Sequence, residues 1–546
     1  MPDVPQSDAI ADAAAELGWP QLRPGQREAV QGVLDGRDVL AVMPTGHGKS
    51  AIYQLAAGLT DGLTVVVSPL IALQRDQVER LEELGADPAV ALNSSQRASE
   101  TREAWEELEA EEAGFLFLAP EQLARDEVIE RVRALEPTLF VVDEAHCVSA
   151  WGHDFRPDYL RLGHVIDALG HPTTLALTAT AAPPVRDEIV ERLRMRDALQ
   201  VVRGFDRPNI YLESHRVADE DDQRAAVVER AAAEQKPGLV YVATRKQAEQ
   251  LADELRAAGM RAEAYHAGMA RAERDRVHDA FTDGDADVVA ATSAFGMGID
   301  KADVRFVLHA AAPDSPDSYY QEIGRAGRDG EPALAALYFR QEDFGVHRFR
   351  TGGSADTDML SKVATRIRRA KEPVPPEQLR ERLDVGASRL TSAVNLLEQA
   401  GAVETNGDGD LVWREGTVKP AVDEAARLAE ARRRVDRSRS DMMRGYAETG
   451  GCRRRFLLGY FGEDLPELCG ACDTCVSGSA ARVEEARGAS EADANWPVGL
   501  DVRHEAWGDG SIVSEDGDRI TVLFDEEGYK TLALEAVERS GVLQPR

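Results

Sequence analysis

The sequence predicts an α/β fold, with two parallel-sheet domains followed by smaller domains of other kinds. Short apolar runs such as 39–42 and 139–142 recur, and each leads into a polar or glycine-containing turn and then a helical stretch. This alternation is typical of parallel strands that are buried on both faces. It occurs in two blocks, separated by a segment at 204–208 that we interpret as a linker, and it stops in the last third. With 546 residues the chain can hold three or more domains.

The composition indicates a cytoplasmic protein. The sequence has no apolar run long enough to cross a bilayer and no signal-peptide pattern. The formal net charge of −33 argues only weakly against a nucleic-acid partner, because salt limits the reach of a surface charge to about 8 Å. Residues 431–455, for example, hold nine arginines against three acids. We therefore interpret the acidic excess as a solubility trait.

A phosphate-binding loop is predicted directly after the first strand. The segment MPTGHGKS (Met43–Ser50) leads from that strand into a helix, which is the order that such a loop requires. Backbone N–H groups of residues 46–49 would cradle phosphate oxygens at the N-terminus of the helix. Lys49 would reach the β and γ phosphates, and the Ser50 hydroxyl would bind Mg²⁺. Met43 stands in the place of the first glycine of the general motif, and an ordinary glycine-rich turn is the alternative.

Two adjacent carboxylates, Asp143 and Glu144, follow the strand at 139–142, at the edge where open α/β sheets place their ligands. One can help to hold a metal ion while its neighbour polarises a water molecule. The loop that follows carries Trp151, His153, Phe155 and Arg156. Aromatic and basic side chains on a loop suit bases that stack and phosphates that need cations. The alternative is a loop whose aromatic side chains only pack.

Further strands are predicted in both blocks, at 63–68, 115–118, 175–177, 239–242, 264–268, 288–291 and 304–309. The second block ends in a predicted helix at 318–330, which would present Gln321, Arg325 and Arg328 on successive turns. Arginines from a second domain can stabilise the charge on a transferring phosphoryl group. The alternative is a solvated helix laced with salt bridges.

Together these motifs resemble those of the RecQ family of superfamily-2 DNA helicases, over roughly residues 15–345 and again at 452–475. LRPGQ resembles the adenine-reading motif of the family, MPTGHGKS its Walker A loop, and DEAHCVSAWGHDFRPDY its Walker B motif with an aromatic-rich loop. TATA, FGMGIDK and QEIGRAGRDG complete the set in the same order. Met43 is usual in the family, whereas His47 stands where a third glycine is common.

The resemblance implies two RecA-like domains, 1–203 and 204–350, with ATP between them. The residues implied for nucleotide binding are Arg23, Gln26, Thr45, Gly46, Gly48, Lys49, Ser50, Asp300 and Gln321, with Asp300 at the ribose. The catalytic residues would be Lys49, Asp143, Glu144, Arg325 and Arg328, and Ser50 and Asp143 would hold Mg²⁺. DNA binding and its coupling to hydrolysis would fall to His146, Trp151, His153, Phe155 and Arg156.

Residues 357–416 are predicted to form a winged helix. A first helix at 359–369 is followed by PPEQLRERL, a turn, a recognition-like helix and a wing at ETNGDGDLVWRE. In the family this unit usually follows the zinc site, so its position here is unusual. The wing tip at 406–410 is short and acidic, which makes it a poor phosphate contact. A role in packing only is the alternative.

Cys452, Cys469, Cys472 and Cys475 are spaced as a metal site within a subdomain at 421–478. Cysteines on closely spaced turns suit tetrahedral coordination of Zn²⁺, and the spacing resembles that of the zinc subdomain of the family. Four unlinked thiols are the alternative. Cys147 is interpreted as a small buried residue.

After a linker at 479–495, residues 496–546 are predicted to form a small SH3- or Tudor-like barrel, with turns at 508–510, 516–518 and 525–528. This unit resembles the C-terminal module of UvrD/PcrA-type helicases. Residues 476–546 hold fifteen acids against seven basic residues, so we expect a protein partner rather than DNA, with RNA polymerase as one candidate. Trp507 and Tyr529 would be exposed anchors. The alternative is a barrel docked on the core.

The function predicted is that of an ATP- and Mg²⁺-dependent DNA helicase, tracking 3′ to 5′ and acting on single-stranded, forked or branched DNA in replication, recombination or repair. One alternative is a DNA-stimulated translocase that separates strands weakly. The other is a winged-helix regulator whose ATPase is vestigial, and the intact Lys49, Glu144 and Arg328 argue against it.

Overall fold

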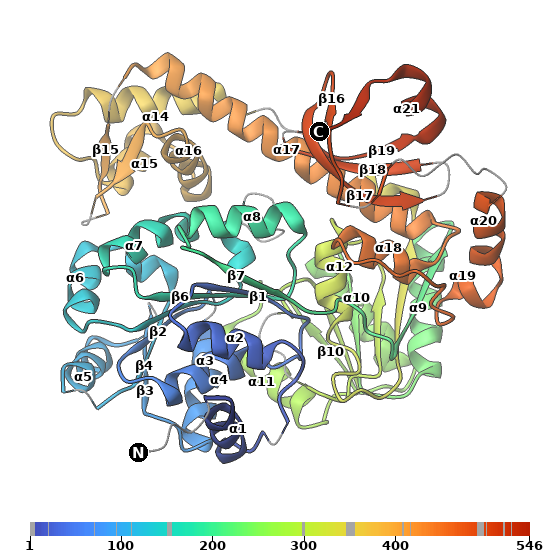
Figure 1. The fold of residues 1–546 in the computed structure, drawn as a ribbon, viewed down its shortest axis with the longest axis horizontal. Coiled ribbons are helices and arrows are strands. Elements are labelled where there is room, and N and C mark those ends of the chain that lie inside the picture. The colour runs from blue at the N-terminus through green and yellow to red at the C-terminus, as the bar shows by residue number, and fades with distance from the viewer. Residues whose placement is uncertain are drawn as a thin grey trace.

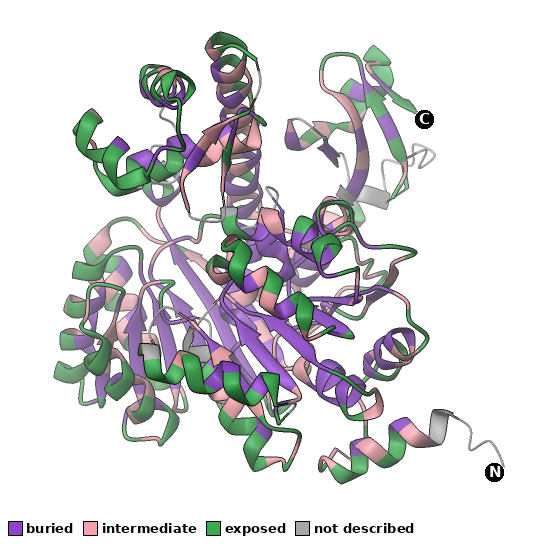
Figure 2. Ribbon diagram, turned by 90° about the vertical axis from the view of Figure 1, so that its left-hand side faces the viewer, coloured by how far each residue is buried: buried purple, intermediate pink, exposed green. Residues whose placement is uncertain are grey.

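The computed structural model (Figure 1) describes residues 6–546 apart from 20, 70, 94–95, 111, 150–155, 297–300, 346–354, 407–408, 415, 489–495, 498, 517–518 and 526. Two parallel sheets form the body of the molecule, as the sequence predicts. Figure 2 shows that their strands are buried, while the helices around them turn exposed faces outward. None of the described helices is long and apolar enough to cross a membrane.

Domain 1 is a seven-stranded parallel sheet in the order β3-β4-β2-β5-β6-β1-β7. Its strands are β1 (Val39–Val42), β2 (Thr64–Val67), β3 (Ala89–Leu92), β4 (Phe115–Leu118), β5 (Leu139–Val142), β6 (Thr173–Thr178) and β7 (Leu199–Val202). Its helices are α1 (Gln6–Glu16), α2 (Gln26–Leu34), α3 (Ser50–Leu59), α4 (Ile71–Glu83), α5 (Ala98–Glu109), α6 (Asp126–Ala134), α7 (Leu162–Ala168) and α8 (Pro183–Arg192). Because only β6 separates β1 from β5, the loops that follow β1 and β5 lie close together.

Domain 2 is a six-stranded parallel sheet in the order β10-β11-β9-β12-β13-β8. Its strands are β8 (Ile210–Arg216), β9 (Gly238–Tyr241), β10 (Ala262–Tyr265), β11 (Val288–Ala291), β12 (Phe306–His309) and β13 (Ala333–Phe339). Its helices are α9 (Glu220–Ala233), α10 (Arg245–Ala257), α11 (Arg271–Thr282) and α12 (Pro316–Ile323). Both sheets have the doubly wound form that the alternating pattern predicts.

The helix predicted at 318–330 is shorter than expected. The helix α12 ends at Ile323, and residues 324–330 form turns, so Arg325 and Arg328 lie on a loop rather than on successive helical turns. The loop is possible because Gly327 adopts a φ of 55°, a left-handed conformation that glycine tolerates. Arg207 stabilises it by donating to the carbonyl oxygens of Gly324 (3.1 Å) and Ala326 (2.7 Å). Those carbonyls would otherwise lack partners at the helix end.

A separate unit of three helices and a hairpin follows domain 2. It consists of α14 (Thr357–Arg369), α15 (Pro376–Leu383), α16 (Ala387–Gln399), β14 (Val403–Thr405) and β15 (Leu411–Trp413), around a core of its own. The ion pair between Arg161 and Glu398 (2.7 Å) ties α16 to domain 1. The long helix α17 (Val418–Glu448) then crosses from this unit to the C-terminal sheet (Figure 1).

The zinc-site region contains α18 (Arg453–Tyr460), α19 (Asp473–Val476) and α20 (Ser479–Gly488). The linker predicted at 479–495 is therefore wrong over its first ten residues, which form α20. The reason is local packing. Ala480 is buried, Ser479 Oγ donates to the Gly450 carbonyl (2.9 Å), and Arg455 pairs with Glu484 (2.7 Å).

The chain ends in a five-stranded antiparallel sheet in the order β19-β18-β17-β16-β20. Its elements are β16 (Asp501–His504), β17 (Gly508–Asp516), β18 (Arg519–Phe524), β19 (Gly528–Ala533), α21 (Leu534–Ser540) and β20 (Leu543–Pro545). Since β17 begins at Gly508, the turn predicted at 508–510 lies instead at 505–507.

The prediction that Tyr529 is an exposed anchor is wrong. Its side chain is buried, with 6% of its surface exposed, because its ring stacks on Tyr460 of α18 at 4.8 Å. Trp507 is half-buried and stacks on His504. One apolar cluster runs from the core of domain 1 through Phe461 to Leu523 and Tyr529. The C-terminal sheet is therefore docked on the body of the protein, which is the alternative that the sequence left open.

Candidate active site and metal centre

A cavity of about 580 Å³ lies where the two parallel-sheet domains meet. Both domains supply its lining, so the cavity exists only in their joint arrangement. Twelve of the predicted site residues line it: Arg23, Gln26, Thr45, Gly46, Gly48, Lys49, Ser50, Asp143 and Glu144 from domain 1, and Gln321, Arg325 and Arg328 from domain 2.

The loop between β1 and α3 is shaped for phosphate. Gly46 and Gly48 have φ values of 79° and 68°, which a side chain would disfavour. Gln26 Nε2 donates to the carbonyl oxygens of His47 (2.9 Å) and Gly48 (2.8 Å), and this fixes the loop. The helix α3 begins at Ser50, so its N-terminal N–H groups and partial positive charge lie at the cavity.

Met43 and His47 depart from the general motif, but neither disturbs the phosphate loop. Met43 is fully buried in the core of domain 1, so its side chain lies away from the cavity. Burial, together with the cations Arg23, Arg207 and Lys49, lowers the pKa of His47 to about 4. The imidazole is therefore neutral at pH 7 and adds no charge to the loop.

The two carboxylates lie opposite Lys49. Glu144 has a φ of 48°, an uncommon conformation for a side-chain-bearing residue, and its N–H donates to Asp143 Oδ1 (2.9 Å). Tyr159 donates to the Asp143 carbonyl (3.1 Å). Burial and the neighbouring Glu144 raise the pKa of Asp143 to about 7, against the opposing effect of Lys49.

These groups fit a divalent cation. Two adjacent carboxylates line the cavity with Ser50, and Glu144 Oε2 is buried without a hydrogen-bond partner. Oxygen ligands of this kind are those that Mg²⁺ binds, together with phosphate oxygens. The cavity thus offers a cation site next to a phosphate site.

The loop at 324–330 brings arginines of domain 2 to the phosphate loop. A Cβ atom on Gly46 would lie 3.0 Å from Arg328 Cγ, and one on Gly324 would lie 2.3 Å from Thr45 Oγ1. Arg325 is 3% exposed, and its Nε has no hydrogen-bond partner. A buried guanidinium needs an anion to compensate it, so the cavity is suited to a ligand with several negative charges.

His146 is buried beneath the carboxylates rather than exposed to a nucleic acid. It lies on the short helix η2 (Ala145–Val148), and its Nδ1 is 3.0 Å from Thr178 Oγ1 and 3.4 Å from Glu144 Oε2. The Thr178 hydroxyl donates to the Thr180 carbonyl (3.1 Å), so it accepts from His146. Thr178 belongs to the TATA segment, but its contact with His146 could not be predicted from the sequence, because the two residues are 32 positions apart.

Arg156 anchors the end of the aromatic-rich loop. Its Nη1 donates to the Pro69 carbonyl (3.0 Å), and at the other end of the loop Ser149 donates to Glu188 Oε2 on α8 (2.6 Å). The predicted residues Trp151, His153, Phe155 and Asp300 lie outside the described residues.

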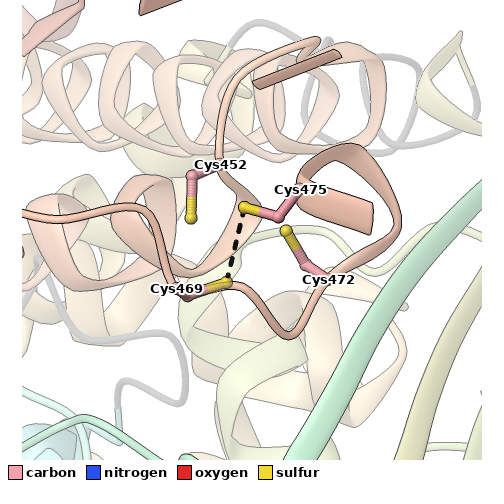
Figure 3. Close-up of side chains that lie close together, drawn as sticks. All are labelled: Cys452, Cys469, Cys472 and Cys475. Atoms are coloured by element: carbon pink, nitrogen blue, oxygen red, sulfur yellow. Dashed lines mark hydrogen bonds between the residues drawn. The ribbon is translucent and has the colours of Figure 1, made fainter. Parts of the chain in front are cut away.

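Four cysteines gather in one cluster (Figure 3), from the segments around α18 and α19. Their sulfur atoms all lie within 4.8 Å of one another, and Cys469 and Cys475 are 3.8 Å apart. Zn–S bonds of about 2.3 Å in a tetrahedron place sulfurs about 3.8 Å apart, whereas a disulfide requires about 2.05 Å. The four thiols therefore fit a structural zinc ion.

Three family models match consecutive parts of the chain. A DEAD/DEAH box helicase model matches residues 23–189, a helicase conserved C-terminal domain model matches 223–330, and a RecQ zinc-binding model matches 416–476. The last of these covers all four clustered cysteines.

Several curated proteins are similar to the chain. A protein of Bacillus subtilis named probable ATP-dependent DNA helicase RecS is 40% identical, over 60% of this chain and 66% of its own length. The ATP-dependent DNA helicases RecQ of B. subtilis and Haemophilus influenzae are 35% and 33% identical, over 85% and 86% of this chain. The chain spans 66% and 63% of the length of those two.

Among solved structures, the DUF1998 helicase MrfA bound to DNA aligns with a TM-score of 0.53 at 18% identity, over 77% of this chain and 61% of that one. The Mycobacterium smegmatis helicase Lhr bound to ssDNA and AMP-PNP aligns with a TM-score of 0.50 at 18% identity, over 98% and 80%. At this identity the likeness concerns the fold.

Zinc content provides a test of the cysteine cluster. The purified protein should hold one zinc ion per chain, and Cys472→Ser should lose it and unfold at a lower temperature, because a closed site contributes folding energy. Metal analysis by mass spectrometry and a thermal melt measure both effects. Cys147→Ser, the same change at a buried cysteine outside the cluster, should keep the metal. Wild-type protein without zinc would contradict the assignment.

Proposed function

The chain belongs to the RecQ family of superfamily-2 helicases, and on this premise we propose that it is an ATP- and Mg²⁺-dependent DNA helicase. The observation that carries the proposal is the joint cavity, which places Lys49 and Glu144 of domain 1 opposite Arg325 and Arg328 of domain 2. A site of this kind can act only while the two domains are together. Hydrolysis can therefore be converted into relative motion of the domains.

Within this proposal, Lys49 and the N–H groups of the phosphate loop bind the β and γ phosphates of ATP. Ser50 and Asp143 would hold Mg²⁺, which neutralises phosphate charge when bound. Glu144 orients the attacking water and accepts its proton, a role that suits its buried oxygen without a hydrogen-bond partner. Arg328 stabilises the γ-phosphate in the transition state, and Arg325 supports it.

The remaining nucleotide contacts are also proposals. Arg23 and Gln26, which line the cavity from domain 1, would recognise the adenine, and Gln321 lines the cavity from domain 2. Asp300 contacts the ribose.

Coupling to DNA is proposed to pass through His146. This residue lies between Glu144 and Thr178, three residues before Ser149, where the aromatic-rich loop begins. Trp151, His153, Phe155 and Arg156 contact DNA, the aromatic side chains by stacking on bases. DNA bound to that loop would then affect the position of Glu144 through the short helix η2, which carries His146.

We further propose that residues 357–416 are a winged helix and that 496–546 are an SH3- or Tudor-like barrel. The hairpin β14–β15 would be the wing, and it carries Glu404 and Asp410 rather than basic residues. This observation favours the second candidate function, a DNA-stimulated translocase that separates strands weakly. A vestigial ATPase is not favoured, because every catalytic side chain expected in the cavity is present.

A role in DNA replication, recombination or repair and a 3′ to 5′ direction remain part of the proposal. RNA polymerase as a partner is not carried forward, since the buried Tyr529 is not an accessible anchor.

Parallel assays of ATP hydrolysis and strand separation on a forked duplex test the proposal. A helicase should separate the strands with ATP and Mg²⁺, and only when one arm provides a 3′ single strand. DNA-stimulated hydrolysis without strand separation would instead establish the translocase. Absence of any DNA-stimulated hydrolysis would contradict both.

Glu144→Gln should retain ATP binding but lose turnover, because removal of a general base typically costs about 10²–10⁴-fold. A fluorescent ATP analogue and a phosphate-release assay measure the two quantities separately. Lys49→Ala is the contrasting variant, since it should weaken binding itself. Near-normal turnover in Glu144→Gln would remove that residue from its role.

Thr178→Val should leave basal hydrolysis within about threefold of wild type while DNA stimulation falls about tenfold, since a lost buried hydrogen bond is worth about 1–3 kcal/mol. Hydrolysis rates with and without single-stranded DNA check this. Thr174→Val is the matched control, because its buried hydroxyl is on the same strand but donates to the Pro172 carbonyl. Equal losses in the two variants would argue against coupling through His146.

A further inference from the structure

The helix α12, which leads into the arginine loop, carries a buried carboxylate in its first turn. Asp317 is 3% exposed, and its partners come from outside domain 2. The Tyr460 hydroxyl of α18 donates to Asp317 Oδ2, and Arg439 Nε of α17 lies 4.0 Å from the same oxygen. A carboxylate buried this deeply is costly unless such partners compensate it. The N-terminus of α12 is therefore bound to α17 and α18.

The C-terminal sheet completes this anchor. The ring of Tyr529 on β19 stacks on that of Tyr460, with ring centroids 4.8 Å apart. With Tyr529 in place, the Tyr460–Asp317 contact is shielded from water, which strengthens the hydrogen bond. The partners of Asp317 thus depend on a segment more than two hundred residues further along the chain.

The turn between β18 and β19 fits closely on the same part of α17. Gly528 has a φ of 74°, and a Cβ atom there would lie 2.2 Å from Ser438 Oγ. Glu527 pairs with Arg434 at 3.1 Å. Arg434 and Ser438 are four residues apart and so lie on one face of the helix, next to Arg439. The sheet therefore docks at the turn of α17 that supplies the cation for Asp317.

The helix α12 connects Asp317 and its partners to the cavity, so a displacement at its N-terminus also displaces the loop that follows it. Its eight residues form a rigid rod about 12 Å long, and Arg325 and Arg328 follow at its far end. There the loop touches the phosphate loop through the close approaches of Gly324 to Thr45 and of Arg328 to Gly46. Contacts this close leave little room for α12 to move without displacing the arginines.

We propose that Tyr529 is a positioning residue for ATP hydrolysis, acting through Tyr460 and Asp317 on the placement of Arg325 and Arg328. The C-terminal sheet is on this account a part of the ATPase rather than a tethered accessory. The inference rests on the proposed function, since it concerns the turnover of the same cavity.

Tyr529→Ala should lower kcat for ATP about 10- to 100-fold, because a misplacement of about 1 Å at a catalytic group can cost that much. KM for ATP and the affinity for single-stranded DNA should change less than about threefold, since phosphate binding rests on Lys49 and the phosphate loop. Tyr529→Phe, which keeps the ring on Tyr460, should recover most of kcat. Steady-state kinetics of the full-length protein measure this split between kcat and KM.

Two further variants separate positioning from general damage. Trp507→Ala removes a large aromatic side chain from the same sheet, on the side that faces His504 and Lys530, and should keep kcat within about twofold of wild type. Tyr460→Phe keeps the shape of the core but removes the donor to Asp317, and should lower kcat as Tyr529→Ala does. It also serves if Tyr529→Ala fails to fold. Normal kcat in the folded Tyr529 and Tyr460 variants, or an equal loss in Trp507→Ala, would overturn the proposal.

Amide hydrogen exchange distinguishes failure of this inference from failure of the proposed function. In Tyr529→Ala, residues 316–323 should exchange faster than in wild type, whether or not the protein hydrolyses ATP. Wild-type protein without ATP turnover would refute the proposed function. Unchanged protection of residues 316–323 in Tyr529→Ala would refute the anchor by itself.

Discussion

The contact between the arginine loop of domain 2 and the phosphate loop of domain 1 is the constraint on which the rest of the structure depends. Arg328 packs against Gly46, and Gly324 against Thr45, so neither loop can move far alone. Several hydrogen bonds hold the loop at 324–330 and the helix before it in place. Arg207 holds its carbonyls, His309 pairs with Glu322 at 2.8 Å, and Tyr320 donates to the Phe205 carbonyl at 2.7 Å.

Charge explains why this contact can be switched by a ligand. The cavity brings Lys49 and the domain 2 arginines Arg325 and Arg328 together with two carboxylates. Burial lowers the pKa of Lys49, and Arg328 lowers it further, while Glu144 and Asp143 oppose both effects. Such a balance changes when a polyanion and a divalent cation enter or leave. Under the proposed function, a change in the charge of the nucleotide would change how strongly the two domains attract each other.

The parts of the site that could be predicted from the sequence are those whose functional residues lie close together in the sequence. The loop around Lys49, the adjacent Asp143 and Glu144, and the cysteine cluster are each encoded within a few tens of residues. What the sequence could not supply depends on contacts between distant segments. The early end of α12 rests on Arg207, the burial of Tyr529 rests on Tyr460, and the helix α20 rests on packing against the zinc-site region. The sequence alone does not show whether an aromatic residue in an acidic segment contacts a partner protein or packs against another part of the same chain.

The central claim is that hydrolysis needs groups from both domains at one phosphate, and Arg328→Ala tests it most directly. The measurement is the rate at which enzyme in excess converts bound ATP to ADP in a single turnover, with DNA present. The account predicts normal ATP binding and a rate about 10³- to 10⁵-fold below that of wild type, the range found when such an arginine is absent. A single-turnover rate equal to that of wild type would contradict it, since domain 1 would then complete the chemistry without domain 2.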